Sequence, residues 1–301
     1  MPELPEVETI VKGLKQKVKN RKITDFWTDW PKYRPIRRHV VGKKILDVER
    51  RGKNILFNLS DHHLLLIHQK MSGHLLVGKW KSVKGIWVSI IPGPLLEDRN
   101  NQYIRLIFFL NNGKMLALSD LRRFAKVLCG SKDVILNLPG IKDLGPEALS
   151  LSEKEFIELF SARGAVPAKS GGQGSAFGGK KKKGILKSVL MNQNFIAGIG
   201  NIYSDEIVWL AKIHPQKRIE KLTLKNLKGL YRAMRKILLK ALKLNGASVD
   251  DYRTVSGERG RYDLVRYVYQ REDEPCQRCG TLIKRIKIGG RSAHFCPKCQ
   301  V

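Results

Sequence analysis

The sequence predicts an α+β protein with two domains: a β-sandwich with a flanking helix, then a mainly helical domain that ends in a cysteine-rich finger. Between residues 22 and 130, short strand-like runs recur at near-even spacing, which is typical of a sandwich or barrel. Between residues 185 and 244, apolar residues recur at helical spacing. The C-terminus carries two Cys-x2-Cys pairs. A chain of 301 residues with 42% hydrophobic residues is long enough for two cores.

The composition indicates a polyanionic partner. Lys and Arg number 57 against 27 Asp and Glu, which gives a net charge of +30 and a pI near 10.1. This excess goes beyond the needs of solubility and favours nucleic acid, although an unusually basic proteome would also produce it. The sequence has no apolar run long enough to cross a bilayer and no signal-peptide pattern. We therefore expect no membrane partner and a cytoplasmic location.

The first eight residues, MPELPEVE, bring an amine and two carboxylates together. Removal of Met1 would leave Pro2 with a free secondary amine, and α-amino groups titrate near pH 7.7–8.0, so part is neutral and nucleophilic. Glu3 and Glu6 share one face if a helix begins here. Apolar residues predict that helix: Val7, Ile10, Val11, Leu14 and Val18. Taken alone, the pattern favours an amphipathic helix whose acidic N-terminus complements the helix dipole.

The strands follow this helix in order. The turn Arg51-Gly52-Lys53-Asn54 predicts a hairpin between 43–50 and 55–59, and Asn111-Asn112-Gly113 predicts another between 103–110 and 114–118. Further strands are expected at 63–68, 74–80 and 86–91. Residues 139–163 predict a connector and a helix starting near Leu151. Residues 164–183 are rich in Gly and Ser and end in four lysines, which predicts a flexible, solvated insertion.

The second half is predicted to be helical. Helices are expected at 185–193, up to Ala211, and over 223–244, with the glycines of GIGNIY breaking the first and Asn201 capping the second. Free backbone N–H groups at such a helix start form a phosphate site. A plain helix-loop-helix core explains the same residues equally well.

The spacing Cys276-x2-Cys279-x16-Cys296-x2-Cys299 predicts a four-cysteine zinc site. Four thiolates close the coordination shell, so we expect one structural Zn²⁺. Between the pairs, basic residues predict a β-hairpin suited to phosphates: Lys284, Arg285, Lys287 and Arg291. Cys129 stays outside this pattern and is expected to be a core residue.

Taken together, these segments resemble the bacterial formamidopyrimidine-DNA glycosylase family, also called Fpg or MutM. The matching motifs are PELPEVET, RRGKN, HQKMSG, DLRRF, GIGNIY and CPKCQ, and they run from Pro2 to Gln300 apart from the 164–182 insertion. The resemblance implies a bifunctional DNA glycosylase and AP lyase that removes oxidised purines such as 8-oxoguanine and formamidopyrimidines. It also implies double-stranded DNA as partner, and a monomer acting near the nucleoid.

The resemblance assigns roles to individual residues. Pro2 attacks the sugar C1′ and forms a Schiff base, Glu3 is the acid, and Glu6 supports the amine or a water. Lys53 contacts DNA beside the reacting sugar, and Arg291 contacts the reacting phosphate. The remaining DNA contacts implied by the resemblance are Met71, Tyr103, Arg122, Phe124, Lys183, Lys187 and Asn201.

Among these, Met71 fills the gap left by the extruded base, Arg122 pairs with the orphaned base, and Phe124 is the wedge beside it. Judged alone, Lys53 is a solvated lysine, and Met71 and Phe124 are more often core residues. Tyr103 takes the place of a DNA-contacting histidine. Other departures from the family pattern are Asn192, Ala125 and Gln270.

The resemblance also divides the chain into four segments. These are a catalytic β-sandwich domain at 1–138, a connector with the insertion at 139–184, a helix-two-turns-helix domain with the lesion-capping loop and a following strand at 185–270, and a zinc finger at 271–301. Two other classes stay open: a damaged-DNA-binding relative without catalysis, and an RNA-binding zinc-ribbon protein. Retention of Pro2, Glu3, Lys53 and Arg291 together argues against the first, because binding alone needs no free amine.

Overall fold

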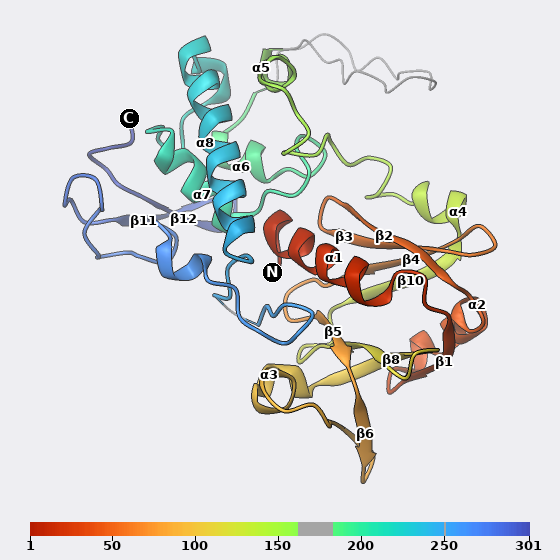
Figure 1. Cartoon of the computed structure of the whole chain (residues 1–301). Helices are drawn as coiled ribbons and strands as arrows, with labels where there is room; N and C mark the ends of the chain where they lie inside the picture. The colour runs from red at the N-terminus through yellow and green to blue at the C-terminus, as the bar shows by residue number, and fades with distance from the viewer. Residues whose placement is uncertain (162–182, 250) are drawn as a thin grey trace. The chain divides into compact units, whose positions relative to one another are not determined.

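The computed structural model describes residues 1–161, 183–249 and 251–301 (Figure 1). It forms two compact units, one made of 1–143 and 240–265, the other of 144–239 and 266–301. The long helix α8 (Leu224–Lys243) therefore begins in the second unit, and the chain re-enters the first unit at Lys240. Most of the predicted insertion, 164–182, lies outside the described residues. No helix in these ranges is long and apolar enough to span a membrane.

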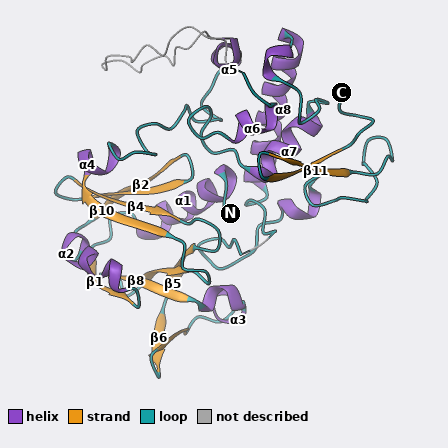
Figure 2. Cartoon of the chain, turned by 180° about the vertical axis from the view of Figure 1, so that it is seen from behind, coloured by secondary structure: helices purple, strands orange, loops and turns teal. Residues whose placement is uncertain are grey.

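The first unit contains the predicted sandwich. One antiparallel sheet has the order β1-β8-β9-β5 and the other β10-β4-β3-β2. Figure 2 draws the strands in orange. Their bounds are β1 Ile23–Thr28, β2 Ile45–Arg51, β3 Asn54–Leu59, β4 His63–His68, β5 His74–Gly78, β8 Ile104–Leu110, β9 Met115–Ser119 and β10 Lys126–Ser131. Inward-facing residues of both sheets form one core. The sandwich and both hairpins are confirmed.

Helix α1 (Leu4–Val18) contacts β2 of one sheet and β5 of the other. Because these are the edge strands of their sheets, the helix closes the side where the two edges meet. Its predicted apolar stripe is buried in the sandwich core, with Val7, Ile10, Leu14 and Val18 fully buried. The helix end that carries Glu3 and Glu6 is thus fixed to the sandwich.

Several connections differ from the prediction. The strand expected over 74–80 divides at Lys79, because β6 (Trp80–Val83) leaves the sheet and pairs with β7 (Ile86–Ser89) as a separate ribbon. Short helices unpredicted from the sequence complete the unit: η1 Pro31–Ile36, α2 Arg37–Val40, α3 Pro94–Glu97, η2 Arg99–Gln102 and α4 Lys132–Leu136. Each has six residues or fewer, too short to show helical periodicity.

The second unit is mainly helical, as predicted. Its elements are α5 Glu153–Ser161, α6 Leu186–Met191, α7 Asn201–Leu210, η3 Ile219–Lys221, the first part of α8 Leu224–Lys243, β11 Lys284–Ile288 and β12 Arg291–Phe295. The last two strands form the predicted basic hairpin. Cys129, in the first unit, lies half-buried on β10 against the sandwich core, as expected.

Two local predictions are wrong. Asn201 does not cap α7, because Gly200 occupies the N-cap position. The strand expected after the lesion-capping loop is absent from 251–270, where η4 (Tyr262–Val265) forms instead. The backbone donors there have other acceptors: Arg261 donates to Leu244, Tyr262 to Gly246, and residues 267–269 to the Glu206 carboxylate. These donors are therefore not available to a strand partner.

Candidate functional site

The start of α1 holds the predicted nucleophile and both carboxylates. Pro2 is buried, and Glu3 and Glu6 are only 2% and 1% exposed. Glu3 and Glu6 form a reciprocal capping box, in which the backbone N–H of Glu3 donates to Oε2 of Glu6 over 2.7 Å. The capping box supplies acceptors for backbone N–H groups that have no intrahelical acceptor in the first helical turn. It therefore fixes the Glu3 side chain directly beside Pro2.

Glu6 also reaches a distant segment of the same unit. Its Oε1 accepts a hydrogen bond of 2.8 Å from the backbone N–H of Ala247. Gly246 has φ +79°, and a Cβ there would lie 2.6 Å from that oxygen. Burial, and then the charge of Glu6, raise the pKa of the buried Tyr252 phenol well above its usual value. Glu6 thus anchors the root of the predicted lesion-capping loop to the helix that carries Pro2.

Lys53 lies in the tight turn between β2 and β3, next to Gly52 at φ +59°. Its side chain is only 6% exposed, so the interpretation as a solvated hairpin lysine is wrong. The positive charge of Lys53 acts on His68, at the end of β4. Burial and then the charges of Lys70, Lys53 and Lys126 lower the pKa of His68 to about 4. His68 is therefore neutral at pH 7, and its Nδ1 accepts a hydrogen bond from the backbone N–H of Lys70.

The predicted intruding residues come together on two connections between the sheets. Residues 69–73 join β4 to β5, and residues 120–125 join β9 to β10. Because β4 pairs with β10 and β5 with β9, the two connections must lie side by side. Met71 on the first is 43% exposed and Phe124 on the second is 56% exposed, so neither is a core residue. An Arg122 Nη1 atom lies 4.0 Å from the Met71 Sδ.

Tyr103 lies just before β8, close to the second connection. Its backbone carbonyl accepts a hydrogen bond from the N–H of Asp120, and its hydroxyl accepts one from Arg99. The structure therefore brings Tyr103 to the same end of the sandwich as Arg122.

In the second unit, Lys183 is exposed but Lys187 is not. The Lys187 side chain is fully buried and forms an ion pair with Oδ1 of Asp205. The other oxygen, Oδ2, accepts hydrogen bonds from the backbone N–H and the Nδ1 of His294, at 2.9 and 3.1 Å. Lys187 thus joins α6 to α7 and, through Asp205, to β12. This burial argues against a direct phosphate contact by Lys187.

The turn before α7 is built around Gln193. Its side-chain amide donates to the carbonyls of Met191 and Ile199, and its oxygen accepts from the N–H of Gly198. Asn201 follows as the first residue of α7, and its Oδ1 atom is buried with no hydrogen-bond partner among the described residues. The N-cap residue of the helix, Gly200, has no side chain with which to cap the helix start.

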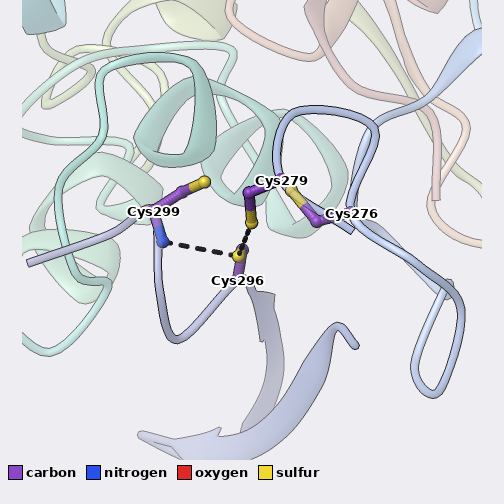
Figure 3. A group of neighbouring side chains, drawn as sticks. All are labelled: Cys276, Cys279, Cys296 and Cys299. Carbon is purple, nitrogen blue, oxygen red and sulfur yellow. Dashed lines mark hydrogen bonds between the residues drawn. The ribbon is translucent and has the colours of Figure 1, made fainter. Parts of the chain in front are cut away.

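The four predicted zinc ligands converge from two loops, as Figure 3 shows. Their Sγ atoms all lie within 4.8 Å of one another. A tetrahedron with Zn–S bonds of about 2.3 Å has S···S edges of about 3.8 Å, so the cluster fits Zn²⁺. Cys276 also accepts a hydrogen bond from the Trp209 indole, and Cys296 accepts one from the N–H of Cys299.

Arg291 begins β12, directly after a turn of two glycines, Gly289 and Gly290, with φ values of +53° and +77°. Its side chain is exposed and makes no ion pair within the described part of the chain. The finger therefore presents a guanidinium at the tip of its hairpin, where it is available to an anion.

Three family models match the chain. They describe the formamidopyrimidine-DNA glycosylase N-terminal domain over residues 1–127, its H2TH domain over 173–253, and the zinc finger found in FPG and IleRS over 273–301. The sequence is similar to the formamidopyrimidine-DNA glycosylases of Pelotomaculum thermopropionicum, at 34% identity over 100% of this chain and 99% of that protein, and of Bacillus subtilis, at 32% over 100% and 99%.

The fold is similar to solved structures of Lactococcus lactis Fpg. A complex with DNA containing an abasic site has a TM-score of 0.78 at 30% identity, and a complex of the wild-type enzyme with N7-benzyl-Fapy-dG DNA has 0.78 at 29%. Each comparison covers 99% of both chains. The predicted family and fold class are confirmed, as is the predicted single structural zinc. On these matches over its whole length, the chain belongs to the formamidopyrimidine-DNA glycosylase family.

Proposed function

We propose that this protein excises oxidised purines from duplex DNA and cleaves the strand at the resulting abasic site, with the Pro2 amine as nucleophile. The observation that carries this proposal is the arrangement at the start of α1. Pro2, which becomes the terminal residue once Met1 is lost, is followed there by two buried carboxylates held in a reciprocal capping box. The relatives named formamidopyrimidine-DNA glycosylase, and the Fpg complex with abasic-site DNA, support the substrate class.

The Pro2 amine serves both steps of the reaction: it displaces the base, and the iminium that it forms allows the eliminations. After loss of Met1, the Pro2 nitrogen attacks C1′, and the bond from C1′ to the damaged base breaks with its electron pair leaving on the base. Glu3 protonates the sugar ring oxygen, the ring opens, and C1′ becomes an iminium bound to Pro2. Loss of a C2′ proton then expels the 3′ phosphate, and a second elimination expels the 5′ phosphate. Water finally releases the sugar fragment and restores the amine.

The surrounding residues take supporting roles in this proposal. Lys53 and Arg291 stabilise the phosphates that leave. Lys183 and Asn201 hold the DNA backbone, and Lys187 keeps the start of α7 in place. The zinc ion, held by the four cysteines, supplies no chemistry and fixes the hairpin that presents Arg291.

The exposed apolar side chains support duplex DNA as the substrate. Met71 and Phe124 are large and exposed beside Arg122, and Tyr103 lies at the same end of the sandwich. Such side chains offset the cost of unstacking when they enter the space of an extruded nucleotide. We further propose that the protein acts as a monomer, in the cytoplasm at the nucleoid, with the four segments 1–138, 139–184, 185–270 and 271–301 as its functional parts.

The proposal is tested by trapping the iminium. Wild-type protein, duplex DNA with one 8-oxoguanine and borohydride should give a covalent crosslink, and peptide mass analysis should place it on Pro2. Pro2→Gly, which keeps a primary amine, should trap more slowly, and Glu3→Gln should bind the duplex but lose most base excision. Intact mass measured beforehand shows whether Met1 is absent. A crosslink on Lys53, or none on a duplex that is demonstrably bound, would refute Pro2 as the nucleophile.

A further inference from the structure

Two buried side chains tie together the connections that carry Met71, Arg122 and Phe124. We call residues 69–73 the Met71 turn and residues 120–125 the Arg122 turn. Asp120, at the start of the Arg122 turn, has no exposed surface, and Ser72 in the Met71 turn is 2% exposed. Neither was singled out by the sequence, and neither can touch DNA from this position.

Their hydrogen bonds form an unbroken chain. The backbone N–H of Ala125 donates to Asp120 Oδ2 over 2.8 Å, and the Ser72 hydroxyl donates to Asp120 Oδ1 over 2.5 Å. The Ser72 oxygen in turn accepts from the backbone N–H of Arg122 over 3.0 Å. The Asp120 carboxylate and the Ser72 hydroxyl thus hold both ends of the Arg122 turn and bind that turn to the Met71 turn.

The backbone reinforces this clamp. The N–H of Asp120 donates to the carbonyl of Tyr103, and the N–H of Gly73 closes the Met71 turn by donating to the carbonyl of Gln69. A Cβ on Gly73 would lie 2.6 Å from that carbonyl oxygen and 3.1 Å from the Ala125 Cβ. The two turns therefore pack at backbone distance, and only a residue without a side chain fits between them.

The clamp fixes the position of the exposed Met71 side chain relative to that of Phe124. Met71 and Phe124 lie on different connections that are far apart in the sequence, and their exposed side chains have few packing contacts to fix them. An intruding group must meet the gap left by an extruded nucleotide to offset the unstacking. An exposed side chain can meet that gap reliably only when neighbouring groups hold it in place.

We propose that Asp120 and Ser72 are positioning residues that hold the Met71 turn and the Arg122 turn as one rigid probe of the duplex. This inference rests on the proposed function. It separates two steps: extrusion of a paired lesion requires the clamp, whereas the chemistry of Pro2 on a nucleotide that is already accessible does not.

The test compares two substrates. One is a duplex with 8-oxoguanine opposite cytosine, and the other is a duplex with a preformed abasic site in a single-nucleotide bulge, where no base must be extruded. Ser72→Ala and Asp120→Asn should slow excision from the first at least tenfold under single turnover and slow cleavage of the second less than twofold. A 2-aminopurine beside the lesion should lose most of its fluorescence rise on binding to either variant.

Ser119→Ala is the matched control. Ser119 is fully buried at the end of β9 beside Asp120, and its hydroxyl donates to the carbonyl of Asn100 rather than to either turn. It should lower the melting temperature about as much as Ser72→Ala while leaving the substrate ratio at the wild-type value. The clamp is only structural, and the inference is wrong, if Ser72→Ala slows excision of 8-oxoguanine and cleavage of the bulged abasic site by the same factor. The same conclusion follows if Ser119→Ala changes the ratio of these two rates as much as Ser72→Ala does. Wild-type protein inactive on both substrates would instead overturn the proposed function.

Discussion

The zinc finger and the start of α1 fix functional groups in two different ways. In the finger, four cysteines from two short loops converge on a site that fits one ion, and their spacing in the sequence already predicts this site. At the start of α1, the Glu6 carboxylate collects donors from its own turn and from Ala247, far along the chain. The comparison teaches that metal sites of this kind are local in sequence, whereas buried carboxylate sites are assembled by the fold.

The same contrast recurs in each unit. Asp120, Asp205 and Glu206 are all fully buried, and all accept hydrogen bonds from segments distant in sequence. A buried carboxylate is costly unless such donors are in place. The finger depends on one added ion, and the carboxylate sites depend on the accuracy of the fold.

The largest effect is expected at the finger. Cys296→Ser removes one of four ligands, and structural zinc in such modules contributes about 10–16 kcal/mol of coupled folding free energy. The variant should lose zinc and DNA binding together, as metal analysis and a binding titration would show. Cys129→Ala is the control, because burial raises the pKa of that thiol to about 11 and it lies outside the cluster. Full zinc content in Cys296→Ser would contradict the ligand assignment.

The buried ion pair in the second unit should give the next largest effect. Lys187→Met leaves the Asp205 carboxylate without its cation and should cost about 3–5 kcal/mol in urea unfolding. Lys183→Met, at an exposed site nearby in the sequence, should leave stability unchanged and reduce the salt slope of DNA binding by about 0.9. If Lys187→Met reduced the salt slope at wild-type stability, Lys187 would be a phosphate contact after all.

These contrasts explain which parts the sequence could predict. Short strand-like runs at near-even spacing and turn residues predicted the sandwich, and cysteine spacing predicted the metal cluster. The family resemblance supplied Met71 and Phe124, which the general preference of apolar residues for cores would have misplaced. Asp120 was missed because its acceptor role follows from which strands pair, and Asn201 was misjudged because Gly200 takes the cap position. No short-range signal in the sequence marks either fact.

The link between Glu6 and Gly246 can be broken sterically. Gly246→Ala adds a Cβ about 2.6 Å from Glu6 Oε1 at φ +79°, so both the backbone and the Ala247 hydrogen bond are strained. Gly85→Ala is matched, with φ +83° and no atom within 4 Å of the added carbon. We expect Gly246→Ala to be less stable than Gly85→Ala by about 2 kcal/mol, and to excise more slowly. Equal stability of the two variants would show that Glu6 does not hold this segment.

The smallest effect is expected from His68, which precedes the Met71 turn. Its folded pKa is about 4 against an ordinary 6.5, mainly because of burial. The unfolded chain therefore binds the proton first, so the stability contributed by neutral His68 is full above pH 6.5 and is lost as pH falls toward 4. We expect a loss of about 1–2 kcal/mol over this window, since the partial exposure of the ring reduces the full effect.

His68→Asn keeps an acceptor near Nδ1 for the N–H of Lys70 and removes the titration. The difference in urea unfolding between this variant and wild type, measured from pH 7 to pH 4.5, isolates the histidine, because any acid loss of zinc is common to both proteins. Lys70→Met should recover part of the difference, since Lys70 is the largest charge acting on the ring. Parallel pH profiles for wild type and His68→Asn would mean that the ring is not held neutral by its burial.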